Sequence, residues 1–125
     1  GIILAKDVRI LADCGAYAGL APEVMHVSAM RSDNMHRLQN VRSHASLVYT
    51  HTPPHGAFRG FGGTQMQFAL NSHIDAMAKM LDVDPLLIHQ RNAIGAGDFL
   101  FGSCSEDNIE RQVLPVEKMN ECCDQ

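Results

Sequence analysis

Residues 55–63 read His55-Gly56-Ala57-Phe58-Arg59-Gly60-Phe61-Gly62-Gly63 and separate a strand-like pattern on one side from a helical pattern on the other. Four of the last eight residues of this stretch are glycine, which favours a loop over a regular helix or a central strand. Thr52-Pro53-Pro54 precedes it and ends a strand, since proline cannot donate to a sheet. Thr64 and Gln67 follow with the spacing of a capping box, which predicts the start of a helix.

On the C-terminal side of this loop, hydrophobic periodicity predicts helices. Apolar residues recur at spacings of three and four over residues 65–81, the clearest helix in the chain. Asp84-Pro85 predicts a second helix that runs towards Ile94, with Asp84 as its N-cap. Residues 98–113 are expected to form an irregular loop, and residues 115–123 a last helix.

On the N-terminal side, the pattern predicts two strands and a short helix. Residues 2–12 alternate as a strand does, or as a hairpin broken near Lys6-Asp7. Pro22 begins a short helical stretch that closes at Asp33-Asn34, and residues 41–50 form the second strand. The expected fold class is therefore α+β, with a few strands packed against the long capped helix.

Composition excludes several classes of function. A length of 125 residues suits one domain, and 46% hydrophobic residues can supply a core. The net charge of −4 and the absence of any run of Lys or Arg argue against a nucleic-acid partner. No apolar stretch approaches the roughly 20 residues that span a bilayer, and the first 13 residues are too charged for a signal peptide. We therefore expect no membrane partner.

The cysteines and the chain ends point to the cell compartment and to a larger whole. The four cysteines show neither a disulfide framework nor metal-ligand spacing, which indicates free thiols and a cytoplasmic location: Cys14, Cys104, Cys122 and Cys123. The chain starts at Gly1 without methionine and stops at Gln125 directly after a helix-like pattern. We expect it to be a segment of something longer.

The glycine-rich loop is the first candidate for chemistry. Free N–H groups before a helix N-terminus favour an anionic ligand, and glycines let that ligand approach the backbone. The alternative is a tight turn that needs positive φ. Phe58 and Phe61, on either side of Arg59, could anchor the loop to the core, or they could stack on a flat ring while the arginine holds an anion.

Other residue types give no recognisable site. The seven histidines lack metal-ligand spacing, so we predict no metal site, and His73 is expected to be packed in its helix. Asp13 and Glu23 are too isolated in sequence to form an acid/base pair, and no nucleophile motif occurs. We name no catalytic residue.

A family resemblance begins at the glycine-rich loop. Gly56–Gly63 followed by Thr64-Gln65 resembles the G-A-F-R-G-F-G-x-P-Q signature of the molybdenum hydroxylases, the xanthine dehydrogenase and aldehyde oxidoreductase family. Four further stretches resemble that family's motifs in order and spacing: Asp13–Tyr17 (D-x-G-A-Y), Asn40-Val41-Arg42 (P-N-V-R), Val48–Pro54 (V-Y-T-N-x-P-P), and Arg91-Asn92 with Gly97-Asp98 (R-x-N and G-D). The resemblance covers the chain from about Ile2 to Asp98.

The resemblance implies a single segment, residues 1–125, of the molybdopterin-binding domain of a large subunit. The enzyme would hydroxylate a heteroaromatic or aldehyde substrate with a molybdenum–molybdopterin cofactor or its cytosine dinucleotide form. Iron–sulfur clusters and FAD would lie on other segments or subunits. Phe61 would contact the small-molecule substrate, and the other loop residues would contact the cofactor: Gly56, Ala57, Phe58, Arg59 (through its backbone N–H), Gly60 and Gly62.

The sequence departs from the family's pattern in three respects. Thr64 replaces the usual proline. The arginine of purine-hydroxylating members falls on Val27, with Arg31 offset by four, which puts purine substrates in doubt. The catalytic glutamate segment and the iron–sulfur motifs do not occur in these 125 residues, so the isolated chain should not turn over substrate. A non-catalytic pterin- or anion-binding module and an inactive truncated relic are the alternatives.

Overall fold

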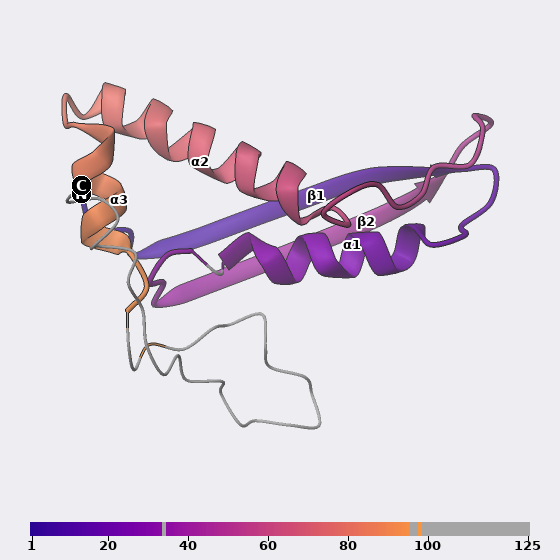
Figure 1. Cartoon of the computed structure of the whole chain (residues 1–125), viewed down its shortest axis with the longest axis horizontal. Helices are drawn as coiled ribbons and strands as arrows, with labels where there is room; N and C mark the ends of the chain where they lie inside the picture. Colours follow the sequence, from indigo (N-terminus) through magenta and orange to yellow (C-terminus); the bar gives the residue numbers. More distant parts are fainter. Residues whose placement is uncertain (34, 96–97, 99–125) are drawn as a thin grey trace.

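The computed structural model describes residues 1–33, 35–95 and 98 (Figure 1). Its elements form the predicted α+β arrangement, in the order β1 (Ala5–Gly15), α1 (Ala21–Met30), the short 3₁₀ helix η1 (Arg31–Asp33), β2 (Asn40–Tyr49), α2 (Gly63–Met80) and α3 (Pro85–Asn92). Apart from Asp98, the predicted loop 98–113 and helix 115–123 lie outside the described residues, as do Cys104, Cys122 and Cys123.

The two strands pair in parallel and lie side by side (Figure 1). Their register runs from Ala5 opposite Asn40 to Asp13 opposite Val48, and a shift then sets Gly15 opposite Tyr49. The alternative of a hairpin broken near Lys6-Asp7 is wrong, because half-buried and exposed residues alternate without a break from Ala5 to Ala12. The connection between the strands contains α1, as a parallel pair requires.

Helix contacts build a core cluster between α2 and α3. Helix α1 contacts both strands, and α2 contacts α1, η1 and α3. The core cluster joins α2 to α3 through buried Ile74, Ala78 and Ile88. Partly buried apolar side chains pack around this cluster, including Ile3 from the N-terminal segment.

The start of α2 differs from the predicted capping box. The N-cap is Gly62, with a φ of +87° and no side-chain cap hydrogen bond. Because Gly62 already begins the helix, Thr64 lies inside the first turn, where its hydroxyl lies within hydrogen-bond distance of two acceptors, Gln65 Oε1 at 2.9 Å and Arg59 O at 3.4 Å. The Gln67 amide donates instead to the carbonyl oxygen of Arg31.

The junction between α2 and α3 consists of a turn at Asp82 and the predicted N-cap at Asp84. Asp82, with a φ of +53°, reverses the chain after α2, and Val83 N donates to Ala78 O at 3.0 Å, the longer bond of a Schellman motif. Asp84 caps α3 as predicted, since its Oδ1 accepts from Leu86 N at 2.9 Å. The described helices include none long and apolar enough to cross a membrane.

Candidate cofactor-binding loop

The glycine-rich loop, defined here as residues 55–63, begins where both strands end. Residues 50–55 run beside the end of β1 and are held by three backbone hydrogen bonds: Thr50 N to Gly15 O (3.0 Å), Ala16 N to Thr52 O (3.1 Å) and His55 N to Cys14 O (3.1 Å). Gly15 makes this approach possible, because a Cβ there would lie 2.3 Å from the carbonyl oxygen of Pro53. The end of β1 therefore fixes where the loop starts.

A polar cluster lies at the same place: Gly15, Thr50 and Thr52 donate hydrogen bonds to the Asp13 carboxylate, and the His55 ring lies beside it. The Asp13 carboxylate accepts from Gly15 N at 2.6 Å, from Thr50 Oγ1 at 2.7 Å and from Thr52 Oγ1 at 3.2 Å. His55 Nε2 lies 3.5 Å from Asp13 Oδ2. The hydrogen bond from Gly15 N–H, followed by those from the two threonines, lowers the pKa of Asp13, so the carboxylate is ionised at neutral pH.

The body of the loop is a tight double turn. Phe61 N donates to Phe58 O at 2.8 Å, and Gly63 N donates to Gly60 O at 2.9 Å. Gly60, Phe61 and Gly62 all have positive φ, with values of +88°, +52° and +87°. The left-handed region is unusual for an aromatic residue. The prediction of a turn that needs positive φ is confirmed at the two glycines.

The exit of the loop lies against α1. A Cβ at Gly62 would lie 2.1 Å from Ser28 Oγ and 2.9 Å from the carbonyl oxygen of Val24. Glycine at this position thus serves packing between the loop and α1. Arg31 lies beside the same exit, with its Cγ 3.3 Å from where a Cβ of Gly63 would be, whereas Val27 is half-buried in α1.

The middle of the loop faces solvent. Residues 55–60 are all exposed, and Phe58 has an exposed fraction of 79%, so the interpretation of Phe58 as an anchor to the core is wrong. Phe61 is half-buried. Within the described part of the chain, the backbone N–H groups of residues 57–60 donate no hydrogen bond. Four exposed donors beside an exposed ring fit a ligand with anionic or acceptor atoms and a flat ring system.

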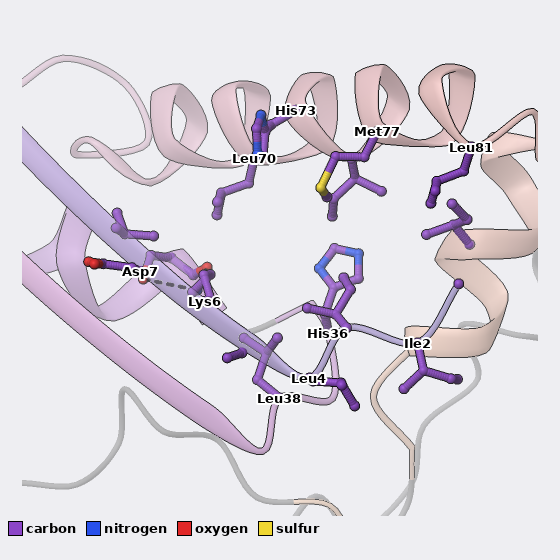
Figure 2. Close-up of a pocket in the computed structure, with 17 residues that line it drawn as sticks. Ile2, Leu4, Lys6, Asp7, His36, Leu38, Leu70, His73, Met77 and Leu81 are labelled. Atoms are coloured by element: carbon purple, nitrogen blue, oxygen red, sulfur yellow. Dashed lines mark hydrogen bonds between the residues drawn. The ribbon is translucent and has the colours of Figure 1, made fainter.

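A pocket of about 500 Å³ lies away from the loop, between the N-terminal segment, the C-terminal half of α2 and α3 (Figure 2). Its lining is largely apolar and includes Ile2, Leu4, Leu70, Met77 and Leu81, and the His36 ring lies within it. His73 also lines it but is exposed, so the prediction of a packed His73 is wrong.

His36 belongs to a hydrogen-bonded chain that no sequence pattern predicted. His36 Nε2 lies 3.1 Å from His89 Nδ1, and His89 Nε2 lies 3.2 Å from Asp75 Oδ1. Burial, with further contributions from His89 and Lys6, lowers the pKa of His36 to about 4. The three residues of this hydrogen-bonded chain, His36, His89 and Asp75, come from separate segments, so no local spacing in the sequence predicts them. Among the described residues, no three His, Cys, Asp or Glu side chains are grouped so as to hold a metal ion.

Comparison with known proteins identifies the class to which this fold and loop belong. Residues 1–93 match the molybdopterin cofactor-binding domain family. The chain belongs to that family, and the resemblance to the xanthine dehydrogenase and aldehyde oxidoreductase group is confirmed.

Individual relatives agree with this assignment. The chain is 44% identical over 92 residues to a probable xanthine dehydrogenase subunit of Bacillus subtilis, a match that covers 74% of this chain and 12% of that protein. It is 34% identical over 121 residues to the nicotinate dehydrogenase large molybdopterin subunit of Eubacterium barkeri, a match that covers 97% of this chain and 28% of that protein.

A solved structure extends the agreement to the fold. The aldehyde oxidoreductase from Desulfovibrio desulfuricans superposes with a TM-score of 0.85 at 25% identity, over 99% of this chain and 13% of that one. The chain thus spans between 12% and 28% of the length of these relatives.

Proposed function

We propose that residues 1–125 are one segment of the molybdopterin-binding domain of a molybdenum hydroxylase, and that the glycine-rich loop forms one wall of its active site. In this proposal the cofactor contacts are Gly56, Ala57, Phe58, Arg59, Gly60 and Gly62, and Phe61 contacts the substrate. The proposal rests on a loop in which the backbone N–H groups of residues 57–60 donate no hydrogen bond to any described residue, in a chain of the molybdopterin cofactor-binding family.

The chain's own part in the reaction is binding and orientation. When bound, the cofactor would supply hydroxylation chemistry: a substrate C–H and water would become C–OH, with two electrons passing to the cofactor and two protons released. The N–H of Arg59 would donate to the molybdenum end of the cofactor, and the other exposed amides would donate to neighbouring acceptor atoms. The Phe61 ring would stack on a flat heteroaromatic or aldehyde substrate and hold it in one orientation.

The remaining parts of the enzyme lie beyond this segment. We propose that other segments or subunits carry the iron–sulfur clusters and FAD, and that the assembled enzyme is cytoplasmic. The cofactor would be molybdenum–molybdopterin or its cytosine dinucleotide form. Residues from those other parts would complete the substrate pocket and supply the catalytic groups.

The experiment compares Phe61→Ala with Phe68→Ala in the full-length molybdenum-loaded enzyme. Phe68 is a matched control, since it is another phenylalanine that lies outside the glycine-rich loop, within α2. We expect Phe61→Ala to lower kcat/KM by roughly threefold to tenfold, the value of one aromatic stacking contact, with molybdenum content unchanged. Phe68→Ala should change neither.

Arg59→Ala separates the backbone role from a side-chain role. This variant keeps the N–H of residue 59, so the proposal predicts full molybdenum content. If Phe61→Ala left turnover at the level of Phe68→Ala, the substrate wall would not be here, and a non-catalytic binding module would become the better description. Loss of molybdenum in Arg59→Ala would overturn the backbone assignment.

A further inference from the structure

The polar cluster at the end of β1 sets the position of the glycine-rich loop. We propose that Asp13 is a positioning residue: its carboxylate fixes the entrance of the loop and thereby the placement of Arg59 and Phe61. This inference rests on the proposed function of the loop, because it concerns how the loop is presented to cofactor and substrate.

The cluster joins three segments of the chain. Gly15 N–H comes from the end of β1, Thr50 and Thr52 follow β2, and His55 is the first residue of the loop. Thr52 Oγ1 also lies 2.8 Å from Thr50 Oγ1 and 3.1 Å from His55 Nε2, so the groups around the carboxylate contact one another. One charged side chain therefore ties both strand ends to the loop.

The strand register explains why this site is at Asp13. Asp13 is opposite Val48 and Gly15 is opposite Tyr49, so Cys14 has no partner in the ladder. This irregularity directs the backbone N–H of Gly15 to the Asp13 side chain instead of to β2. The Cys14 side chain takes no part in the polar cluster: it is fully buried, and its Sγ lies 3.2 Å from Val48 O.

The loop depends on its entrance because its middle has little other support. In the described structure, residues 56–60 form no hydrogen bond to β1, β2 or α1. The other supports lie towards the exit of the loop, where the Thr64 hydroxyl of α2 lies 3.4 Å from Arg59 O and Gly62 packs against α1. A shift of residues 52–55 would therefore move residues 56–58 and alter how Arg59 and Phe61 are presented. The hydrogen bonds to the Asp13 carboxylate are charge-assisted, so they hold residues 50–55 in place more strongly than neutral hydrogen bonds would.

Hydrogen–deuterium exchange on the full-length large subunit tests this inference, with Asp13→Asn compared against Asp7→Asn. Asp7 is the matched control: it is on the same strand, and its carboxylate forms an exposed ion pair with Arg42. Within peptide 55–61, the N–H groups of His55 and Phe61 donate backbone hydrogen bonds and so report on opening of the loop. We expect Asp13→Asn to speed exchange of these two amides at least about tenfold, because the opening equilibrium loses charge-assisted bonds. The α2 peptide 66–80 should keep its rate, and Asp7→Asn should change neither peptide.

Thr52→Val supplies a second, milder variant, because it removes one hydroxyl and leaves the carboxylate. Thr52→Val should also accelerate hydrogen–deuterium exchange of the loop amides, by a smaller factor than Asp13→Asn. An unchanged exchange rate of the loop amides in Asp13→Asn would overturn the inference. Equal acceleration of exchange in the loop and in α2 would also overturn it, because that result indicates general destabilisation. Faster loop exchange with unchanged kcat, KM and molybdenum content would leave Asp13 as the positioning residue but contradict the proposed function of the loop.

Discussion

Gly62 and Gly56 show, at the scale of single residues, how differently two glycines of one loop are used. Gly62 has a φ of +87°, and a Cβ there would lie 2.1 Å from Ser28 Oγ, whereas a Cβ at Gly56 would meet no atom within 4 Å. Gly62→Ala should therefore lower the free energy of unfolding by at least about 2 kcal/mol, since backbone strain and a clash with α1 add together.

Gly56→Ala is the matched control for this prediction. It adds the same methyl group to the same loop in open space, so its unfolding midpoint in urea should equal that of the unmodified protein. Equal midpoints for Gly62→Ala and Gly56→Ala would mean that the loop does not pack on α1 as described.

The sequence identified the residues of the loop but not their support. Residues 55–63 are unusual enough in composition to mark a loop, and their order resembles a family signature. Asp13 has no recognisable role in the sequence, because its partners at Thr50, Thr52 and His55 become neighbours only through the parallel register of β1 and β2. Short-range patterns do not reveal a parallel register, since no turn fixes it.

At the scale of elements, the chain His36–His89–Asp75 links the segment before β2 to α3 and α2. The pKa of His36 is about 4 in the folded protein and 6.5 in a model peptide, so the unfolded chain binds more protons between these values. Stability contributed by neutral His36 is therefore complete above pH 6.5 and declines as the pH falls towards 4, by no more than about 1.4 kcal/mol per pH unit.

Replacement of His36 should flatten this dependence. The unfolding midpoint of His36→Gln is expected to change less between pH 6.5 and 4 than that of the unmodified protein. His44→Gln is the control, because His44 is exposed on β2, where its Nε2 lies 3.1 Å from the hydroxyl of Ser46. An unaltered pH profile in His36→Gln would show that another group governs acid sensitivity.

The least accurate predictions were the bounds of β1, expected at residues 2–12 and found at Ala5–Gly15, and the cap of α2, whereas β2 was located within one residue at either end. Local periodicity and an N-cap define α2 and α3, and both were located within two residues at either end. The predicted Thr64 cap is wrong because Gly62, in the left-handed region, starts the helix earlier. The sequence alone does not show which loop glycine adopts that backbone conformation.

At the scale of the whole molecule, many large apolar side chains are exposed. They include Ile2, Leu4, Leu11, Tyr49, Phe58, Phe68, Met80, Leu81 and Leu86. A sheet of two parallel strands is also unusual, since parallel sheets are normally covered on both faces. Both features agree with a chain that spans only 12% and 28% of the length of two of its relatives.

We therefore expect residues 1–125, produced alone, to self-associate. Sedimentation velocity should show oligomers and concentration-dependent association, while the full-length large subunit should give a discrete species at the same protein concentration. A monodisperse 13.7 kDa monomer with one cooperative unfolding transition would contradict this expectation.

The most direct test of the central claim is an experimental structure of the full-length subunit isolated with its molybdenum cofactor. We predict that the glycine-rich loop keeps the left-handed turn at residues 60–62. The N–H of Arg59 should donate to the cofactor, and the Phe61 ring should face the substrate space. A cofactor bound elsewhere, with the amides of residues 57–60 still directed to solvent, would contradict the claim that this loop binds it.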